Sequence, residues 1–392
     1  MSDPTATKTG LSQSLTLLMA LATALAVANI YYNQPMLGIM EQDMGSPGMT
    51  GMIPTVTQAG YAIGLFFLVP LGDLHDRRRL IVTQFLLLAL ALVFMALAPS
   101  AGIAMVASLA VGVCATVVQQ ILPFAASLAD PASRGKTMGT VMAGLLCGIL
   151  LSRTLAGFVA THWGWREMYG LSAPLAVCLA GLMAALLPRN TGRQTMSYGS
   201  ALVSMLTLIR QEPALRFSTA IQALLFASFS AFWTVLALHL QEAQFQLGAD
   251  VAGLFGVIGA VGVIAAPIAG RLADRHGPAL VIAAGAVLSL LSWLVFGLWD
   301  SVTGMVVGVI VLDFGVQSAL VSNQHVVFAL QPEARNRLNT VFVTGMFIGG
   351  ACGSAGATLL FHRVGWSGVC GYGVALAFIA LVLAIWSNRA AA

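Results

Sequence analysis

One acidic side chain lies deep inside a long apolar stretch of the sequence. Asp313 stands in VIVLDFGVQ, about eleven residues into an apolar segment at 302–326, which a rise of about 1.5 Å per helical residue places near the middle of a bilayer. A charge at that depth costs about 2.5–3.5 kcal/mol on insertion scales, so such residues usually face a cavity and mark ion or proton pathways. Because burial favours the neutral acid, Asp313 is the proton-coupling candidate. The alternative is a structural hydrogen bond to a neighbouring helix.

A basic side chain, Arg153, lies within another apolar segment, at 137–160. Arginine keeps its proton in proteins, so it is a poor proton carrier but a good fixed counter-charge inside a membrane. Arg153 could pair with Asp313, bind an anionic substrate, or hydrogen-bond a backbone carbonyl group at an interface. The sequence leaves these roles open.

Polar and aromatic side chains collect at a few places inside the apolar segments. Amides facing a cavity can hydrogen-bond many substrates without fixing a charge, and as a set these residues predict a polar cavity. A single amide could equally bond a neighbouring helix, which is worth about 0.6 kcal/mol on average in one measured bundle. Phe232 and Trp233 could supply an aromatic wall or simply pack. The substrate-cavity candidates are Asn29, Tyr31, Tyr32, Asn33, Gln34, Gln119, Gln120, Trp233, Gln317, Asn323 and Gln324.

Two charged hairpins, GDLHDRRR at 72–79 and GRLADRHG at 270–277, occur at corresponding places in the chain. Each has a glycine, an aspartate four residues later and then an arginine, and each follows an apolar segment with a proline near its end. Charge contacts that break and re-form suit a rocking motion between two states of similar energy. Alternatively, the basic residues only hold the loop on one side of a membrane. The gating candidates are Gly72, Asp73, Asp76, Arg77, Arg78, Arg79, Gly270, Arg271, Asp274 and Arg275.

The composition requires these residues to be positioned by membrane helices. The 392 residues are 58% hydrophobic and only 8% charged, whereas a soluble domain has about 25% charged residues. About 20 apolar residues cross a bilayer as a helix. We therefore predict an all-α polytopic membrane protein with twelve transmembrane helices, at about 14–36, 50–70, 80–98, 101–128, 137–160, 168–187, 214–239, 250–270, 278–299, 302–326, 338–360 and 366–387.

The longest gap between these segments divides the chain into two halves. Fifteen of the eighteen lysines and arginines fall in the segments on one side of the predicted membrane, so we expect that side, and both termini, to be cytoplasmic. The linker contains an amphipathic stretch at 198–208, which we expect on the membrane surface. The predicted parts are an N-terminal tail (1–13), a six-helix bundle (14–187), a linker (188–213), a second six-helix bundle (214–387) and a tail (388–392).

An internal repeat relates the two halves. Residues 131–166 match 332–367, with Pro131 aligned to Pro332 and Gly148 to Gly349. Two parallel six-helix halves are an architecture of secondary transporters, which bind their substrate near the membrane midplane between the halves.

Several chemistries lack support in the sequence. No phosphate loop of the Gly-Lys-Ser/Thr type is present, and none of the five cysteines has metal-ligand spacing. The basic residues form no continuous face for a nucleic acid. We therefore expect no cofactor, no metal, no nucleic-acid partner and no enzymatic activity.

Several motifs resemble those of the major facilitator superfamily, over nearly the whole chain. The hairpin at 72–79 is similar to that family's signature between its second and third helices, and the copy at 270–277 is the closer match. In the first copy Arg79 occupies the position of the last glycine, which Gly277 fills in the second. The resemblance implies the major facilitator fold, with two pseudo-symmetric six-helix bundles and with the first, fourth, seventh and tenth helices lining the central cavity.

Within that superfamily, the chain looks most like bacterial proton-coupled efflux permeases of the drug and sugar exporter type. The similar segments are NIYYNQP at 29–35, GILLSRTLAG at 148–157, and 317–339. The second only partly matches the antiporter motif, because Ser152 and Arg153 replace its Gly-Pro pair.

We therefore expect a monomeric transporter in a bacterial inner membrane that exports a small organic compound in exchange for protons by alternating access. A metabolite uniporter or a proton-coupled importer, in which Asp313 binds the substrate, is the alternative. A non-transporting receptor and a membrane enzyme are the other classes to distinguish. The expected partners are a small-molecule substrate, protons and the lipid bilayer.

Overall fold

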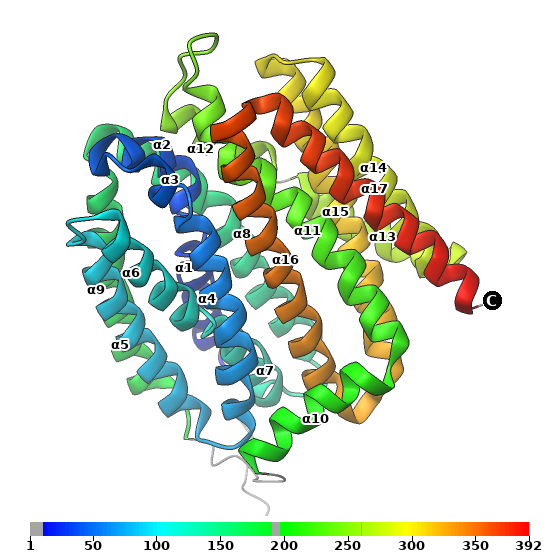
Figure 1. Ribbon diagram of the computed structural model, residues 1–392. Coiled ribbons are helices and arrows are strands. Elements are labelled where there is room, and N and C mark those ends of the chain that lie inside the picture. The colour runs from blue at the N-terminus through cyan, green and yellow to red at the C-terminus, as the bar shows by residue number, and fades with distance from the viewer. Residues whose placement is uncertain (1–10, 190–196, 260, 392) are drawn as a thin grey trace, which may run out of the picture.

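The computed structural model describes residues 11–189, 197–259 and 261–391, and its long elements in these ranges are all helices (Figure 1). Eleven helical segments of the described chain are long and apolar enough to cross a membrane. The remaining predicted span, at 250–270, corresponds to two helices on either side of residue 260, α12 (Ala249–Ile258) and α13 (Val261–His276). The predicted all-α polytopic fold is confirmed.

The bounds of the other helices follow the predicted segments closely. The first half contains α1 (Gln13–Ala28), α2 (Asn33–Met44), α3 (Pro47–Thr50), α4 (Ile53–Leu68), the 3-10 helix η1 (Val69–Asp73), α5 (Arg77–Ala96), α6 (Ala101–Ala115), α7 (Val118–Leu128), α8 (Arg134–His162) and α9 (Trp165–Leu186). After α10 (Tyr198–Gln211), the second half contains α11 (Pro213–Leu240), α12, α13, α14 (Pro278–Leu298), α15 (Val302–Leu330), the 3-10 helix η2 (Pro332–Ala334), α16 (Arg335–Val364) and α17 (Trp366–Ala391).

Two of the predicted segments, 14–36 and 101–128, are broken, the first at 29–32 and the second at 116–117, and α2 continues beyond the predicted end at 36 to Met44. At the first break the Asn29 side-chain amide donates to the carbonyl of Leu25 at 2.6 Å, and at the second the Thr116 hydroxyl donates to the carbonyl of Val113, also at 2.6 Å. Side chains that bond nearby carbonyl groups compete with the helical hydrogen bonds and favour a local bend. The chain therefore changes direction at Asn29 and Thr116.

Helices of the two halves pack directly against each other. α2 packs on α11, α4 on α16, and α8 on α12. The α8–α12 contact is close because Gly253 has no side chain; an added Cβ would lie 2.6 Å from the Arg153 carbonyl oxygen. The Thr154 hydroxyl donates to the Gly253 carbonyl at 3.0 Å and fixes the crossing. Small residues at crossings are how membrane helices approach each other closely.

Helix α10 lies across one end of the molecule and joins the halves (Figure 1). The Tyr198 hydroxyl donates to the Phe67 carbonyl of the first half at 2.9 Å, and Ser204 bonds Arg337 of the second half. Residues 1–10, 190–196 and 392, which belong to the predicted tails and linker, lie outside the described part of the chain. The exact domain boundaries remain predictions.

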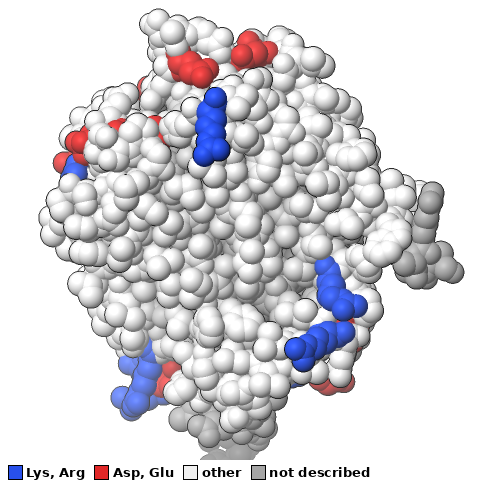
Figure 2. Space-filling model, in the orientation of Figure 1, with Lys and Arg blue, Asp and Glu red and all other residues white. Residues whose placement is uncertain are grey.

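The surface carries the pattern of a membrane protein. On the face shown in Figure 2, charged side chains gather toward the two ends and a broad uncharged belt separates them. Many large apolar side chains are exposed, among them Leu90 and Val106, which are each more than half exposed. Exposed apolar surface of this extent is expected where lipid covers the protein. We call the end with the Gly72–Arg79 hairpin and α10 the hairpin end, and the opposite end the far end.

Candidate transport site

Trp233 of α11 brings the two buried charges of the sequence analysis close together. The guanidinium carbon of Arg153 lies 4.0 Å from the centre of the Trp233 ring. The indole N–H of Trp233 donates to Asp313 Oδ1 in a long hydrogen bond of 3.4 Å. Arg153 and Asp313 are 2% and 5% exposed, and no ion pair within 4.0 Å joins them among the described residues. The indole ring therefore separates the two charges.

Arg153 is held by rings and one amide. Its Nε donates to Gln34 Oε1 at 2.9 Å, and its guanidinium carbon lies 4.7 Å from the centre of the Tyr31 ring and 5.9 Å from that of Phe229. A desolvated cation over an aromatic face gains about 2 kcal/mol or more. The Arg153 Nη2 is buried and has no hydrogen-bond partner. The Arg153 guanidinium therefore has an N–H donor group, at Nη2, that no acceptor of the described chain satisfies.

The break between α12 and α13 lies against Asp313. A Cβ added at Gly259 would lie 2.5 Å from Asp313 Oδ2, and one added at Gly262 would lie 3.5 Å from Asp313 Cβ. The distance at 259 requires glycine, whereas the distance at 262 is an ordinary van der Waals contact. Asp313 is therefore packed against α11, the end of α12 and α13, and only 5% of its surface is exposed.

A row of aromatic rings leads from this charged site toward the hairpin end. Tyr61 and Phe347, from opposite halves, have ring centres 4.4 Å apart. Phe347 contacts Phe226 at 5.2 Å, Phe226 stacks on Phe229 at 5.5 Å, and Phe229 meets Trp233 at 6.0 Å. The row of rings therefore lies between the charged site and the large cavity.

The large cavity lies at the hairpin end, between the two halves, and has a volume of about 1180 Å³. Leu65 and Val343, each one helical turn below the ring pair Tyr61–Phe347, belong to its lining. Its polar lining consists of Asp73, Arg77, Gln119, Gln120, Ser127, Arg134, Glu333, Asn336, Arg337, Asn339 and Thr340. A cavity of this size is large enough for a small organic molecule.

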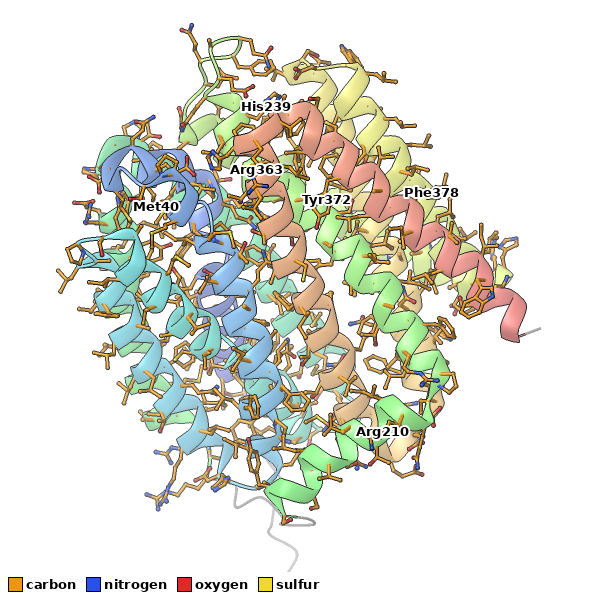
Figure 3. All side chains as sticks on the ribbon, viewed as in Figure 1. Met40, Arg210, His239, Arg363, Tyr372 and Phe378 are labelled. Carbon is orange, nitrogen blue, oxygen red and sulfur yellow. The ribbon has the colours of Figure 1, made fainter. Side chains whose placement is uncertain are left out.

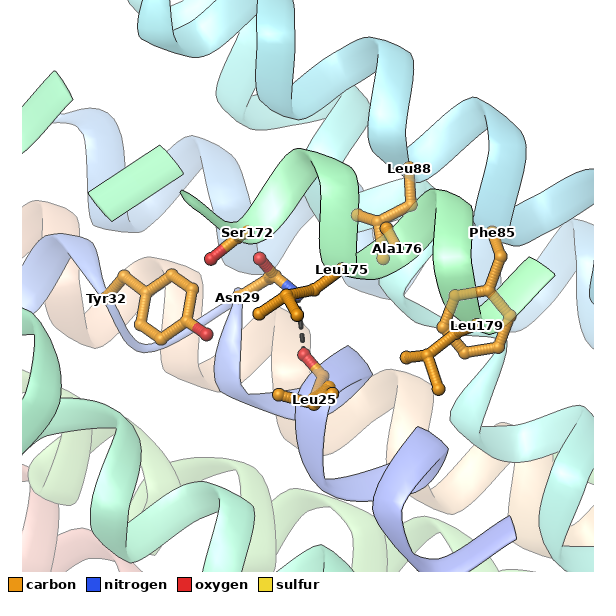
Figure 4. A pocket seen from close by; sticks show the side chains of 9 residues that line it. All are labelled: Leu25, Asn29, Tyr32, Phe85, Leu88, Ser172, Leu175, Ala176 and Leu179. Carbon is orange, nitrogen blue, oxygen red and sulfur yellow. Dashed lines mark hydrogen bonds between the residues drawn. The ribbon is translucent and has the colours of Figure 1, made fainter. Parts of the chain in front are cut away.

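The other predicted cavity residues are distributed over several places. Asn29 and Tyr32 line a separate space of about 10 Å³ inside the first half, room for about one water molecule (Figure 4). Asn33 donates to the Thr57 hydroxyl at 3.0 Å. In the second half Asn323 donates to Gln222 Oε1 at 3.3 Å.

The two remaining glutamines on α15 differ in their surroundings. Gln317 lies against Gly262, where an added Cβ would be 3.0 Å from its Cγ, and Gln324 is half-buried. Of the predicted amides, Gln119 and Gln120 are the ones that line the large cavity.

Sequence reasoning overlooked two polar residues at the interface between the halves, Gln58, which is buried, and Glu41, which is partly buried. Gln58 Oε1 accepts from the Ser230 hydroxyl of the other half at 3.0 Å. Glu41 of α2 faces His362 of α16. Gln58 stands inside an apolar segment, which is the same signal that marked Gln119, so it could have been found.

The first charged hairpin makes more side-chain contacts than the second. Arg77 pairs with Asp73 at 2.7 Å and donates through Nε to the Gly72 carbonyl at 2.8 Å. In the second hairpin Arg271 Nε donates to the Pro267 carbonyl at 3.1 Å.

Comparison with known proteins agrees with this architecture. The model of the Major Facilitator Superfamily matches residues 19–324 and, in a second alignment, 219–391. The chain belongs to this superfamily. It is 39% identical to the putative uncharacterized transporter YgaY of Escherichia coli (strain K12), over 95% of each chain. It is 22% identical to the probable sugar efflux transporter of Helicobacter pylori, over 84% of each chain.

A solved structure shares the fold. The bacterial homolog of the human lysosomal transporter Spinster, in an inward-facing and unoccupied conformation, superposes with a TM-score of 0.78 at 14% identity, covering 97% of this chain and 98% of that one. This likeness confirms the predicted fold. The family match makes the chain a secondary transporter of the superfamily rather than an enzyme, and the predicted family is confirmed.

Proposed function

We propose that this transporter exports a small organic compound in exchange for protons and that Asp313 carries the proton. The proposal is carried by the observation that Asp313 is the one buried aspartate or glutamate among the described residues, and that its hydrogen-bond donor is the neutral indole of Trp233. In the described chain, no cation lies within 4.0 Å of the Asp313 carboxylate to hold it in the ionised form. The group can therefore exist either protonated or ionised. A buried acid of this kind is typical of proton pathways.

Alternating access is supported by the difference between the two ends. The hairpin end has the large cavity, whereas hydrogen bonds between the halves close the far end. The Thr55 hydroxyl donates to Ser354 at 3.0 Å, and the Thr358 hydroxyl donates to the Gly51 carbonyl at 3.0 Å. Neutral hydrogen bonds contribute about 0.5–1.5 kcal/mol each, so a rocking motion can break them and form others.

In the proposed cycle, the far end faces the outside and the hairpin end faces the cytoplasm. When the far end is open, Asp313 takes up a proton and the substrate leaves. When the hairpin end is open, Asp313 releases the proton and a new substrate enters the cavity. Arg153 stays charged throughout, so the attraction across the Trp233 ring is present only while Asp313 is ionised.

The unpartnered Nη2 of Arg153 favours a second candidate function, a proton-coupled importer of organic anions. An anionic substrate could accept from the unpartnered Nη2. Neutralising Asp313 would remove the negative charge that competes with that anion for Arg153, so proton and anion would bind together. This linkage predicts movement of both in the same direction.

The test uses purified protein in liposomes that contain a pH-sensitive dye. A proton gradient is imposed, and lipophilic cations, sugars, amino-acid derivatives and organic anions are added in turn. We expect one class to drive proton movement opposite to its own, and Asp313→Asn to abolish that movement while substrate counterflow continues. Asp250→Asn, in the first turn of α12, is the matched control and should transport normally.

Three other results would change the proposal. Unchanged pH-driven transport in Asp313→Asn would refute the role of Asp313. Proton and substrate movement in the same direction would establish the importer. Substrate uptake without proton movement would establish a uniporter.

A further inference from the structure

One face of α16 carries a row of small polar residues that contact the first half. Gly350, Ser354, Thr358 and His362 follow one another at intervals of four residues, so they share one face of the helix. Gly350 lies under the Gln58 side chain, and Ser354 and Thr358 bond Thr55 and the Gly51 carbonyl. The row runs from the middle of the molecule to the far end, where His362 is its last member.

His362 faces a carboxylate of the other half. Its Nε2 lies 3.4 Å from Glu41 Oε1 of α2, and that oxygen is buried with no hydrogen-bond partner. The two side chains are 31% and 11% exposed. Among the described residues this is the ion pair that joins the halves, because every other pair links groups of the same half. The pair can therefore form only when the far end is closed.

The other ionisable groups of the packed elements already have partners. On α2, Asp43 bonds Arg166 and the Trp165 indole. At the end of α11, His239 lies between Glu242 at 2.7 Å and Asp300 at 3.0 Å.

Two more groups lie nearby on the second half. The Tyr372 hydroxyl of α17 donates to the Cys352 carbonyl at 3.1 Å, and Arg363 is exposed beside His362 on α16. Figure 3 shows Arg363 and His239 toward the far end, opposite Arg210 of α10. The described parts of α3 and of the far half of α4 have no ionisable side chain. His362 therefore has Glu41 as its own carboxylate.

We propose that Glu41 and His362 form a second proton-binding site, separate from Asp313, and that protonation of His362 stabilises the closed far end. A neutral imidazole offers Glu41 no positive charge, whereas an imidazolium does. Histidine changes charge near physiological pH. Since the pair exists in one of the two states only, acidification shifts the population toward that state. The proposal rests on the alternating-access part of the proposed function and not on the role of Asp313.

The test measures the width of the far end directly. Spin labels are placed at the exposed positions 42 and 243, on α2 and after α11, in a cysteine-free form of the full chain in lipid nanodiscs. Electron–electron distances are recorded at pH 5.5 and pH 8 in the Asp313→Asn background, so that titration of Asp313 does not contribute. We expect the ratio of closed to open molecules to rise about two- to five-fold at the lower pH, as for a partly exposed ion pair.

Variants decide whether the pair is responsible. His362→Gln and Glu41→Gln should each remove the pH response, and His362→Arg should keep the far end closed at both pH values. His162→Gln is the matched control, because His162 is an exposed histidine near the same end that bonds the Phe158 carbonyl, and it should respond like the parent. Elution as one monodisperse species establishes that each variant is folded.

A pH response that persists in both glutamine variants would overturn the proposal, and so would a parent with no response. These outcomes are independent of the dye experiment, because Asp313 is absent throughout. Absence of proton-coupled flux in the unmodified protein would refute the proposed function and leave this second site standing.

Discussion

The two charged hairpins have similar sequences but different surroundings. The copy at 270–277 matches the superfamily signature more closely, yet the copy at 72–79 makes more contacts. In the first hairpin Arg77 bonds Asp73 and the Gly72 carbonyl, and Arg78 bonds the Ala184 carbonyl at the end of α9. In the second, the side chains of Asp274 and Arg275 take part in no hydrogen bond or ion pair of the described chain.

The local backbone explains the difference. The chain leaves α4 through the 3-10 helix η1, and Gln120 of α7 donates to the Leu68 carbonyl at 2.8 Å, which draws the first hairpin against α7 and the cavity. In the second half α13 stays helical to His276, and Gly277 turns the chain with a φ of 85°. At the matching position in the first half, Arg79 lies inside α5, where the helical backbone does not require a glycine. Resemblance to a signature therefore says little about how far a hairpin is engaged.

The largest expected effect contrasts the two glycines. Gly72 lies under the Gln120 side chain, whereas a Cβ at Gly270 would meet no atom within 4 Å. Gly72→Leu should therefore destabilise the protein by about 1–3 kcal/mol, because it displaces Gln120 from its hydrogen bond to the Leu68 carbonyl. Gly270→Leu, inside α13, should be neutral or stabilise the protein by up to about 1 kcal/mol, because glycine is unfavourable in a helix. Thermal unfolding of the purified variants in detergent measures both. Equal losses would mean that both hairpins are equally packed.

A smaller effect is expected at the arginines. Arg77→Gln removes an ion pair and a hydrogen bond to a backbone carbonyl, which together contribute about 1–2 kcal/mol. Arg275→Gln removes neither. Unfolding measurements at low and high salt distinguish the two contributions, because salt screens only the ion pair. If Arg275→Gln proved the more damaging, the second hairpin would have the greater role.

The smallest effect concerns the helix cap. Asp76 precedes α5, and its Oδ1 accepts from the Arg78 backbone N–H at 3.0 Å. Asp76→Ala should cost about 0.5–1 kcal/mol of stability, whereas Asp274→Ala, within α13, should cost less. Hydrogen exchange of the first turn of α5 provides a local readout, and unchanged protection there would contradict the capping role.

Much of the site could be recognised in the sequence, because the side-chain types themselves stand out from the apolar segments around them. Asp313 and Arg153 are charged residues inside apolar segments, and the free-energy cost of burying a charge there was enough to single them out. Trp233 was a candidate for the cavity, but its position between the two charges depends on how α11 packs against α8 and α15. Asn29 and Tyr32 looked like cavity residues of the same kind as Gln119, yet they face a small space inside the first half. Helical spacing does not reveal which neighbour a polar face meets.

By itself, the sequence determined the class of this protein. Apolar segments long enough to span a bilayer, the repeated hairpin and the scarcity of charge follow from local composition, since the membrane acts on every segment separately. Only the tertiary structure decided which end is closed and by what. Glu41 and His362 are 321 positions apart, and their contact arises from the packing of two halves whose relative position no local pattern encodes.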